Sequence, residues 1–303
     1  MSSQDRPKMT KAERTAAARE QARLIREAAV KKQKRNGWLI RGGVIVAALA
    51  IIAVVALIVV TTMQNNAPIA DKGPVAANMN SYGGAVIGKD SKLVPPAQPA
   101  GEVDKSTVPA EPTAPPSAMT DTANIGIAAT PKGKPAQVVI YLDFMCPFCN
   151  SFEKTNAAAL TEMANAGTIT YEYRPITILD QLSSGTNYSS RAAAAAAAVA
   201  NTAPEKYQEY VSKLFANQPQ ENSTGLSNDQ LKQYAKDLGV NIDSAVDNRT
   251  YRPQVAYTNQ LALAHGLKGT PTIFVDGKVY PGNPQTNYSD FKQFVEGIIA
   301  AKK

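Results

Sequence analysis

The chain has 303 residues, a formal net charge of +7, two cysteines and one histidine. So few cysteines exclude a disulfide-rich scaffold, and the Cys and His residues together cannot supply four ligands to a metal ion. The positive charge is concentrated at the start: residues 1–41 hold 12 Lys and Arg against 4 Asp and Glu, whereas the remaining residues hold 20 against 21. Charge therefore gives no support to a nucleic-acid-binding domain.

Residues 42–60 contain no charged side chain in 19 positions. As a helix they would extend about 28 Å at 1.5 Å per residue, close to the thickness of a bilayer's hydrocarbon core. Trp38 lies at the near edge, where an amphipathic ring favours the membrane interface. We therefore predict a transmembrane anchor over 38–63, preceded by a basic, helical cytoplasmic tail over 1–37.

The flanks of this anchor indicate its orientation. Basic side chains cluster before the apolar run, whereas residues 61–73 carry one Lys and one Asp. The positive-inside rule then places the N-terminus in the cytoplasm and residues 64–303 outside a cell membrane that the chain crosses once. A cleaved signal peptide is the alternative, but its basic region would have 41 residues and its apolar stretch exceeds roughly 7–15 residues.

The segment 64–120 is rich in Pro and Ala, and 9 of the chain's 20 prolines lie between residues 66 and 120. Such a composition is typical of a semi-extended spacer that builds no core of its own. One part differs: residues 82–94 resemble a short hairpin that turns at Lys89 and Asp90. This hairpin would add an edge to the main domain.

The domain over 121–303 begins with strands. Residues 125–129 form a short apolar strand candidate, and residues 137–144 are a nearly continuous apolar run typical of a buried central strand. Pro147 marks the first turn of a helix that runs to about residue 166. Residues 168–174 alternate between apolar and polar positions, so they predict the next strand and complete a βαβ unit.

A helical stretch follows before the last strands. Ser227 and Gln230 form a capping-box pattern before the third of its four predicted helices, and a break is expected near Pro253. Asp276-Gly277 is a strong hairpin signal between two short strands. The predicted helices cover 189–201, 204–216, 231–238 and 242–265, the strands cover 272–275 and 278–280, and an amphipathic helix closes the chain over 289–300. The order predicts an α/β domain.

The two cysteines, Cys146 and Cys149, stand at the start of the helix that follows the buried strand. There, free backbone N–H groups and the helix dipole would stabilise a Cys146 thiolate, the nucleophile of disulfide exchange. Cys149, one turn later, can resolve a mixed disulfide, and Pro147 fixes the helix start. A structural disulfide would close only a four-residue loop, and a metal site bridging two chains would rest on one Cys pair per chain, so redox catalysis is favoured.

A second element is Thr270-Pro271, at the start of the strand 272–275. After a strand–CxxC–helix unit, a cis bond before Pro271 is the expectation, with an ordinary trans turn as the alternative. The Thr270 backbone would then lie beside the cysteines and pair with an extended substrate peptide.

The motifs YLDFMCPFCNSFE and GTPTIFVDG together resemble the DsbA-like family of thioredoxin-fold oxidoreductases. The resemblance implies a thioredoxin fold over 121–303 with a helical insertion at about 182–266, preceded by one transmembrane helix. The tail, span and linker resemble the membrane-anchored, MdbA-type proteins of actinobacteria. The resemblance also implies a monomeric oxidase of secreted or cell-envelope proteins, with the Cys146–Cys149 disulfide as its only redox group. A quinone-linked membrane partner of the DsbB or VKOR-like kind would reoxidise that disulfide.

Two positions depart from that family. Phe148 stands where DsbA proper has a histidine, which removes a group expected to stabilise the thiolate. Ile140 stands six residues before Cys146, where many relatives carry a buried carboxylate. The nearest acid is Asp143, for which proton transfer with Cys149 and hydrogen bonding within the strand-to-helix turn both remain open. His265, the only histidine, is expected to face the C-terminal end of a helix dipole, with a proton-shuttle role as the alternative.

Three functions stay open on this sequence. The first is an oxidase that introduces disulfides into extracytoplasmic proteins. The second is a disulfide reductase or isomerase supplied with electrons from the membrane. The third is a non-catalytic thioredoxin-fold module whose cysteines stay oxidised. The partners expected are membrane lipid and Cys-containing proteins, and not nucleic acid.

Overall fold

The computed structural model describes residues 10–113 and 118–302, apart from several side chains within the first helix. The chain divides into two units, Met1–Gln64 and Asn65–Lys303. Each unit is described by itself.

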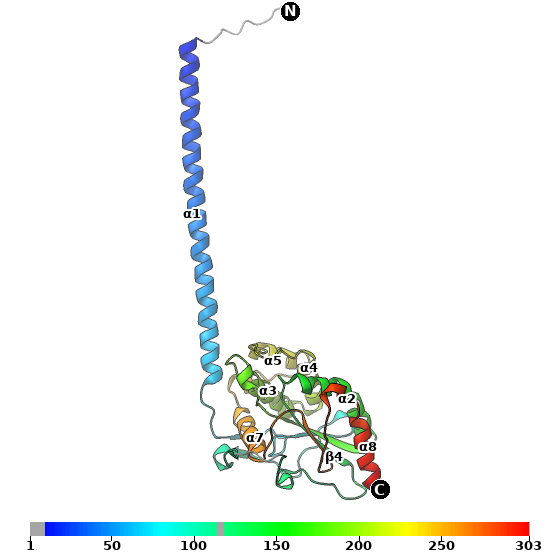
Figure 1. Cartoon of the computed structure of the whole chain (residues 1–303). Helices are drawn as coiled ribbons and strands as arrows, with labels where there is room; N and C mark the ends of the chain where they lie inside the picture. The colour runs from blue at the N-terminus through cyan, green and yellow to red at the C-terminus, as the bar shows by residue number, and fades with distance from the viewer. Residues whose placement is uncertain (1–9, 114–117, 303) are drawn as a thin grey trace, which may run out of the picture. The chain divides into compact units, whose positions relative to one another are not determined.

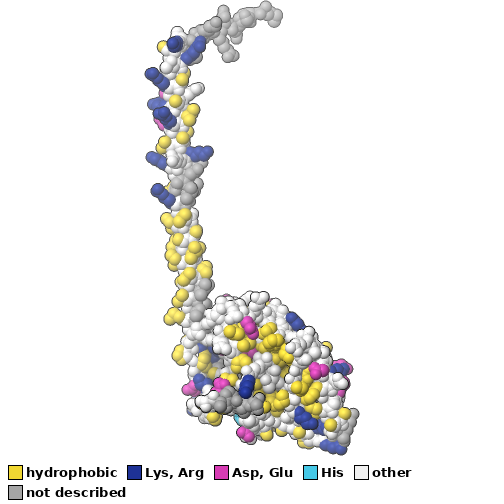
Figure 2. All heavy atoms as spheres, viewed as in Figure 1, with side chains coloured by type: hydrophobic (Ala, Val, Ile, Leu, Met, Phe, Trp, Pro, Cys, Tyr) yellow, Lys and Arg dark blue, Asp and Glu magenta, His cyan; other side chains and the backbone are white. Residues whose placement is uncertain are grey.

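The first unit consists of the long helix α1 (Lys11–Asn66), which continues by two residues into the second. Figure 2 shows Lys and Arg side chains along the N-terminal part of α1 and hydrophobic side chains along the part that follows. Within the described residues, we find no helix with an apolar stretch sufficient to cross a bilayer. Part of the anchor predicted at 38–63, including the side chains of Leu57 and Ile58, lies outside the described residues.

A five-stranded sheet forms the centre of the second unit (Figure 1), in the order β2-β5-β4-β6-β7. The strand β4 pairs in parallel with β5 and antiparallel with β6, and the edge strands β7 and β2 are antiparallel to their neighbours. The bounds are β2 Ala85–Ile87, β4 Ala136–Leu142, β5 Ile169–Pro175, β6 Thr272–Val275 and β7 Lys278–Val279. The predicted central strand, βαβ unit and final hairpin are therefore present.

Both faces of β4 are buried, as its apolar sequence indicates. Val138, Ile140 and Leu142 belong to the larger hydrophobic cluster, which also contains side chains from α2 (Pro147–Asn165) and α8 (Phe291–Lys302). Val139 and Tyr141 belong to a smaller cluster on the opposite face. A strand covered on both sides supports a rigid scaffold for the residues that follow its C-terminal end.

The helical insertion lies between β5 and β6, where it is expected. Its central helix is α3 (Tyr188–Thr202), whose alanine run is almost wholly buried because small side chains let neighbouring helices approach closely. The predicted capping box of Ser227 and Gln230 is present. The last predicted helix is interrupted, with Pro253 in the first turn of its second part. The other helices are α4 (Tyr207–Ala216), α5 (Asn228–Lys236), α6 (Asp243–Asp247) and α7 (Arg252–Ala264).

The segment expected to be a spacer instead packs onto the domain. The strands β1 (Lys72–Pro74) and β3 (Glu102–Asp104) pair with each other, and the turn from 82 to 94 contributes β2 to the sheet edge. Val75, Ala76 and Met79 are buried. The spacer prediction is wrong for residues 72–81 and 95–108, because apolar side chains between the prolines find partners on the domain that composition does not reveal. Residues 82–94, by contrast, turn back on themselves and add an edge strand to the sheet, as the sequence predicts.

The short strand predicted at 125–129 is also wrong. Residues Thr122–Ile125 form the 3-10 helix η3, and Gly126 follows in the left-handed conformation with φ +70°. Neither conformation belongs to a strand. Ile125 and Ile127 are nevertheless buried in the smaller cluster. The apolar character of this segment therefore reflects packing rather than pairing, since β4 already has β5 and β6 as neighbours.

Candidate redox site

The two cysteines meet at the N-terminus of α2. Cys146 is the N-cap residue, and Pro147 occupies the first turn. The backbone N–H of Cys146 donates to the carbonyl of Asp143 at 3.0 Å, which closes the turn between strand and helix. Both cysteines are free and buried, with exposed fractions of 3% and 2%, while the Phe148 side chain between them is 51% exposed.

The two thiols have opposite electrostatics. Hydrogen bonds from the Cys149 thiol, from the Thr270 side chain and from the backbone N–H groups of Cys149 and Phe148 outweigh burial and lower the pKa of Cys146 to about 7. Burial, followed by the neighbouring Cys146, raises the pKa of Cys149 well above its ordinary value. The Cys149 thiol, assisted by the backbone N–H groups at the start of α2, therefore makes Cys146 the thiolate of the pair.

The strand β6 brings Thr270 to the same place. The peptide bond between Thr270 and Pro271 is cis, as the sequence predicts. The Cys146 thiol donates to the Thr270 carbonyl at 3.3 Å, across 124 positions of sequence. The backbone that precedes β6 thus faces the reactive sulfur.

A groove of about 620 Å³, open to solvent, adjoins this contact. Phe148, Pro271 and Tyr288 contribute to its lining. Tyr288 is 3% exposed, and burial, together with the two nearby cysteines, raises its pKa to about 12. Sequence reasoning missed Tyr288, because it lies in irregular chain before α8 and no motif marks it.

Asp143 is fully buried behind the site. Its carboxylate accepts hydrogen bonds from the Met145 N–H at 2.9 Å, the Leu179 N–H at 3.0 Å and the Ser189 hydroxyl at 2.6 Å. Burial, only partly offset by these bonds, raises the pKa of Asp143 to about 6. This geometry matches the turn-holding role, because the carboxylate oxygens bind Met145, Leu179 and Ser189, whereas Asp143 interacts with Cys149 through its backbone.

A second buried carboxylate, Glu153, lies one turn after Cys149 in α2. It accepts a 2.6 Å hydrogen bond from the Tyr173 hydroxyl and a 3.3 Å bond from Ser212. Burial raises its pKa. Sequence reasoning missed this residue, although its spacing of four from Cys149 places both on one helix face. Ile140, where a carboxylate was sought, is buried and apolar.

His265 is the C-cap residue of α7, and its Nδ1 lies 2.9 Å from the Thr120 carbonyl. This position matches the expected helix-end role. The hydrogen-bond partner of the ring, Thr120, lies in the segment before β4 and not at the cysteines. Within the described residues no group of three or more His, Cys, Asp and Glu side chains is placed to hold a metal ion.

Comparison with known proteins agrees with this geometry. The profile of a family described as thioredoxin matches residues 126–297. The disulfide bond formation protein D of Bacillus subtilis is 25% identical over 169 residues, which cover 54% of this chain and 71% of that protein. The serine/threonine-protein kinase PknE of Mycobacterium tuberculosis is 28% identical over 177 residues, 55% of this chain but 30% of the kinase. The chain thus matches about a third of that relative's length.

A solved structure supports the same fold. BdbD from Bacillus subtilis, in oxidised form, superposes with a TM-score of 0.50 and 18% identity, covering 76% of this chain and 98% of BdbD. Oxidised Mtb DsbA is 28% identical with a TM-score of 0.47, covering 58% of this chain and 95% of DsbA. The domain has a thioredoxin fold, with the paired cysteines at the N-terminus of α2. This chain belongs to the thioredoxin family.

Proposed function

We propose that the domain exchanges disulfides with Cys-containing proteins, with Cys146 as nucleophile and Cys149 as resolving thiol. In the oxidising direction, a substrate thiolate attacks Cys146 of the Cys146–Cys149 disulfide, and Cys149 leaves as a thiolate that takes up a proton. A second substrate thiolate then attacks the mixed disulfide and releases Cys146. The substrate gains a disulfide and loses two electrons, which the cysteine pair takes up.

The observation that carries this proposal is the placement of the two thiols. Cys146 is the N-cap of α2, where its pKa is lowered, and Cys149 lies buried one turn later, where its pKa is raised. A stable leaving thiolate at Cys146 makes the mixed disulfide short-lived. The groove beside Phe148, Pro271 and Tyr288 supplies a surface for an extended peptide, which the Thr270 backbone can bind by main-chain hydrogen bonds.

The same electrostatics support one direction of exchange. Interactions that stabilise the Cys146 thiolate exist only in the reduced protein, so they favour reduction of the pair and oxidation of the substrate. We therefore propose an oxidase, with Phe148 in place of histidine making it a weaker oxidant than DsbA proper. The reductase or isomerase reading and the non-catalytic module remain the alternatives.

Equilibration of the full chain with glutathione buffers of stated potential tests this proposal. We expect a potential well above that of a structural disulfide, and reduced protein that unfolds at higher denaturant than oxidised protein. A Cys146→Ala variant should lose oxidative refolding of a reduced test protein. Oxidised protein that is the more stable form would contradict the oxidase assignment, and rapid insulin reduction without oxidative refolding would favour the reductase.

We also propose that α1 tethers the domain outside the cell membrane, where a quinone-linked membrane protein of the DsbB or VKOR-like kind would reoxidise it and secreted proteins would be its substrates. The support is the uncharged run 42–60, with exposed Val44, Ile45 and Ile52, following a basic segment. Labelling of the reduced cysteines by a membrane-impermeant maleimide in intact cells tests the location. Labelling only after lysis would contradict it.

A further inference from the structure

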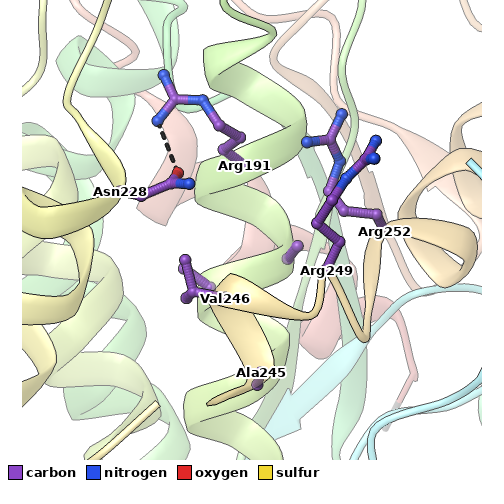
Figure 3. Close-up of a pocket in the computed structure, with 8 residues that line it drawn as sticks. Arg191, Asn228, Ala245, Val246, Arg249 and Arg252 are labelled. Carbon is purple, nitrogen blue, oxygen red and sulfur yellow. Dashed lines mark hydrogen bonds between the residues drawn. The ribbon is translucent and has the colours of Figure 1, made fainter. Parts of the chain in front are cut away.

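The helical insertion contains a second hollow, away from the cysteines. Three arginines line it: Arg191 from α3, Arg249 from the turn between α6 and α7, and Arg252 from the first turn of α7 (Figure 3). Small side chains, including Ala194 and Ala245, form the rest of the lining, with about 280 Å³ of empty space, the open mouth included. We call this region the arginine hollow.

The guanidinium of Arg191 is fully engaged. Its N–H groups donate to the carbonyls of Thr186, Thr224 and Leu226, to the Thr186 hydroxyl and to the Asn228 side chain, at distances from 2.6 to 3.4 Å. All these acceptors are neutral. Arg191 therefore ties the loop before α5 to α3 and contributes its positive charge to the hollow without a hydrogen-bonded carboxylate.

The other two arginines have unused donors. Arg252 is only 6% exposed as a residue and makes no hydrogen bond or ion pair within the described part of the chain, but its guanidinium nitrogens keep some contact with solvent. Arg249 donates from Nη2 to the Ala67 carbonyl at 2.7 Å, but its buried Nε has no partner. Figure 3 shows the two side chains side by side on the α6–α7 side of the hollow. Buried polar groups without partners are uncommon, and unpaired buried charge is costly.

The charges around the hollow do not balance. Among the described residues, no carboxylate lies within 4.0 Å of any of these three guanidiniums. Asp180 acts on Arg191 and Arg252 from a greater distance, and its own oxygens are occupied by Ser190. The acids of α6 are paired with lysines of α5. Burial lowers the pKa of Arg252 to about 10, so it remains charged at neutral pH.

We propose that the arginine hollow binds a phosphate-class oxyanion, held by the free N–H groups of Arg249 and Arg252. Guanidinium forks match the geometry of tetrahedral oxyanions, and an anion there would supply both the missing hydrogen bonds and the missing charge. This inference is independent of the cysteine chemistry, because none of the three arginines belongs to the redox site.

Two sources supply this chemistry: dissolved phosphate and the headgroup phosphate of a lipid. Arg249 holds the Ala67 carbonyl, and Ala67 follows the last residue of the uncharged run, Val60, by seven positions. If that run crosses the membrane, as proposed above, the connecting chain spans at most about 25 Å. A lipid headgroup would then lie within reach of the hollow, so the test has an arm for each source.

The experiment measures the unfolding temperature of the full chain in maltoside micelles, which contain no phosphate. Sodium phosphate is titrated against sodium chloride of equal ionic strength. We expect a saturable, phosphate-specific rise of roughly 2–4 °C at ten times the Kd. The same titration in phosphatidylglycerol nanodiscs separates the sources: an unchanged response assigns dissolved phosphate, and loss of the response together with a higher starting temperature assigns the headgroup.

Three variants complete the test. Arg252→Gln and Arg249→Gln should each abolish the phosphate response, and two independent variants guard against one that fails to fold. Lys154→Gln removes a charge from the exposed side of α2 and should keep the response. A rise no larger in phosphate than in chloride, or one that persists in both arginine variants, would overturn the proposal while leaving the redox assignment intact.

Discussion

The Ser189 hydroxyl donates a 2.6 Å hydrogen bond to Oδ1 of Asp143. It connects the first turn of α3, in the helical insertion, to the turn between β4 and α2 that presents the cysteines. The same carboxylate accepts from the Met145 N–H and, through its other oxygen, from the Leu179 N–H. The insertion is therefore attached to the redox turn by hydrogen bonds to a buried carboxylate, in addition to apolar packing.

Removing the Ser189 hydroxyl should weaken this attachment. In Ser189→Ala, the buried Asp143 carboxylate loses a charge-assisted hydrogen bond from a hydroxyl donor, so we expect a fall of about 1–3 kcal/mol in the free energy of unfolding. Denaturant unfolding of the reduced protein measures it. Ser212→Ala, which removes a longer 3.3 Å bond to Glu153, is the matched control and should cost less. Equal losses in the two variants would argue against a special role for Asp143.

Asp143 should also give the protein a distinctive pH dependence. Its pKa in the folded protein is about 6, above its ordinary value of 3.8, so the native state binds the extra proton between these values. The contribution of this group to the free energy of unfolding is therefore complete below about pH 4. It falls by roughly 3 kcal/mol as the pH rises through 6. Unfolding of wild type and Asp143→Asn at pH 4, 5, 6 and 7 tests this. The variant should lack this component, so parallel profiles would contradict it.

The pKa of Cys146 should depend on its partner thiol, because the hydrogen bond from Cys149 is the largest cause of the depression to about 7. We expect Cys149→Ala to raise the Cys146 pKa towards 9. Cys149→Ser keeps a hydroxyl donor and should stay closer to wild type. The rate of iodoacetamide alkylation as a function of pH gives the pKa. Identical midpoints for wild type and the Ala variant would show that the helix N-terminus alone stabilises the thiolate.

The elements nearest the cysteines were predictable because their signals are local. An apolar run predicted β4, Pro147 predicted the start of α2, and the Cys-x-x-Cys spacing fixed both thiols on one helix end. Thr270 was found from its proline and from the strand that follows it. Each of these features depends on neighbouring residues in the sequence, and the pairing of β4 with β6 then brings them together.

The features that sequence reasoning missed depend on distant partners. Ser189 is an ordinary helix residue until folding brings it to Asp143, 46 positions earlier. Tyr288 reaches the cysteines from irregular chain. The proline-rich segment was expected to be a spacer because its average composition is that of a spacer. Its packing depends instead on single apolar side chains, such as the buried Val75 and Met79. The edge strand within 82–94 was predicted, but its pairing with β5 in particular depends on distant residues.

The packing of that segment can be tested at Gly84. A Cβ at this position would meet Oε1 of the buried Glu172 at 1.6 Å and its Cδ at 2.3 Å, and Glu172 is held by Arg174 and Asn80 at 2.6 and 2.8 Å. Because the carboxylate cannot move without breaking these bonds, Gly84→Ala should lower the free energy of unfolding by about 3 kcal/mol or more. Gly297→Ala is the control: nothing lies within 4 Å of its added Cβ, and the helix α8 should gain up to about 1 kcal/mol. Calorimetry of both variants measures the difference, and a Gly84→Ala protein as stable as wild type would show that residues 72–108 are not held against the sheet as described.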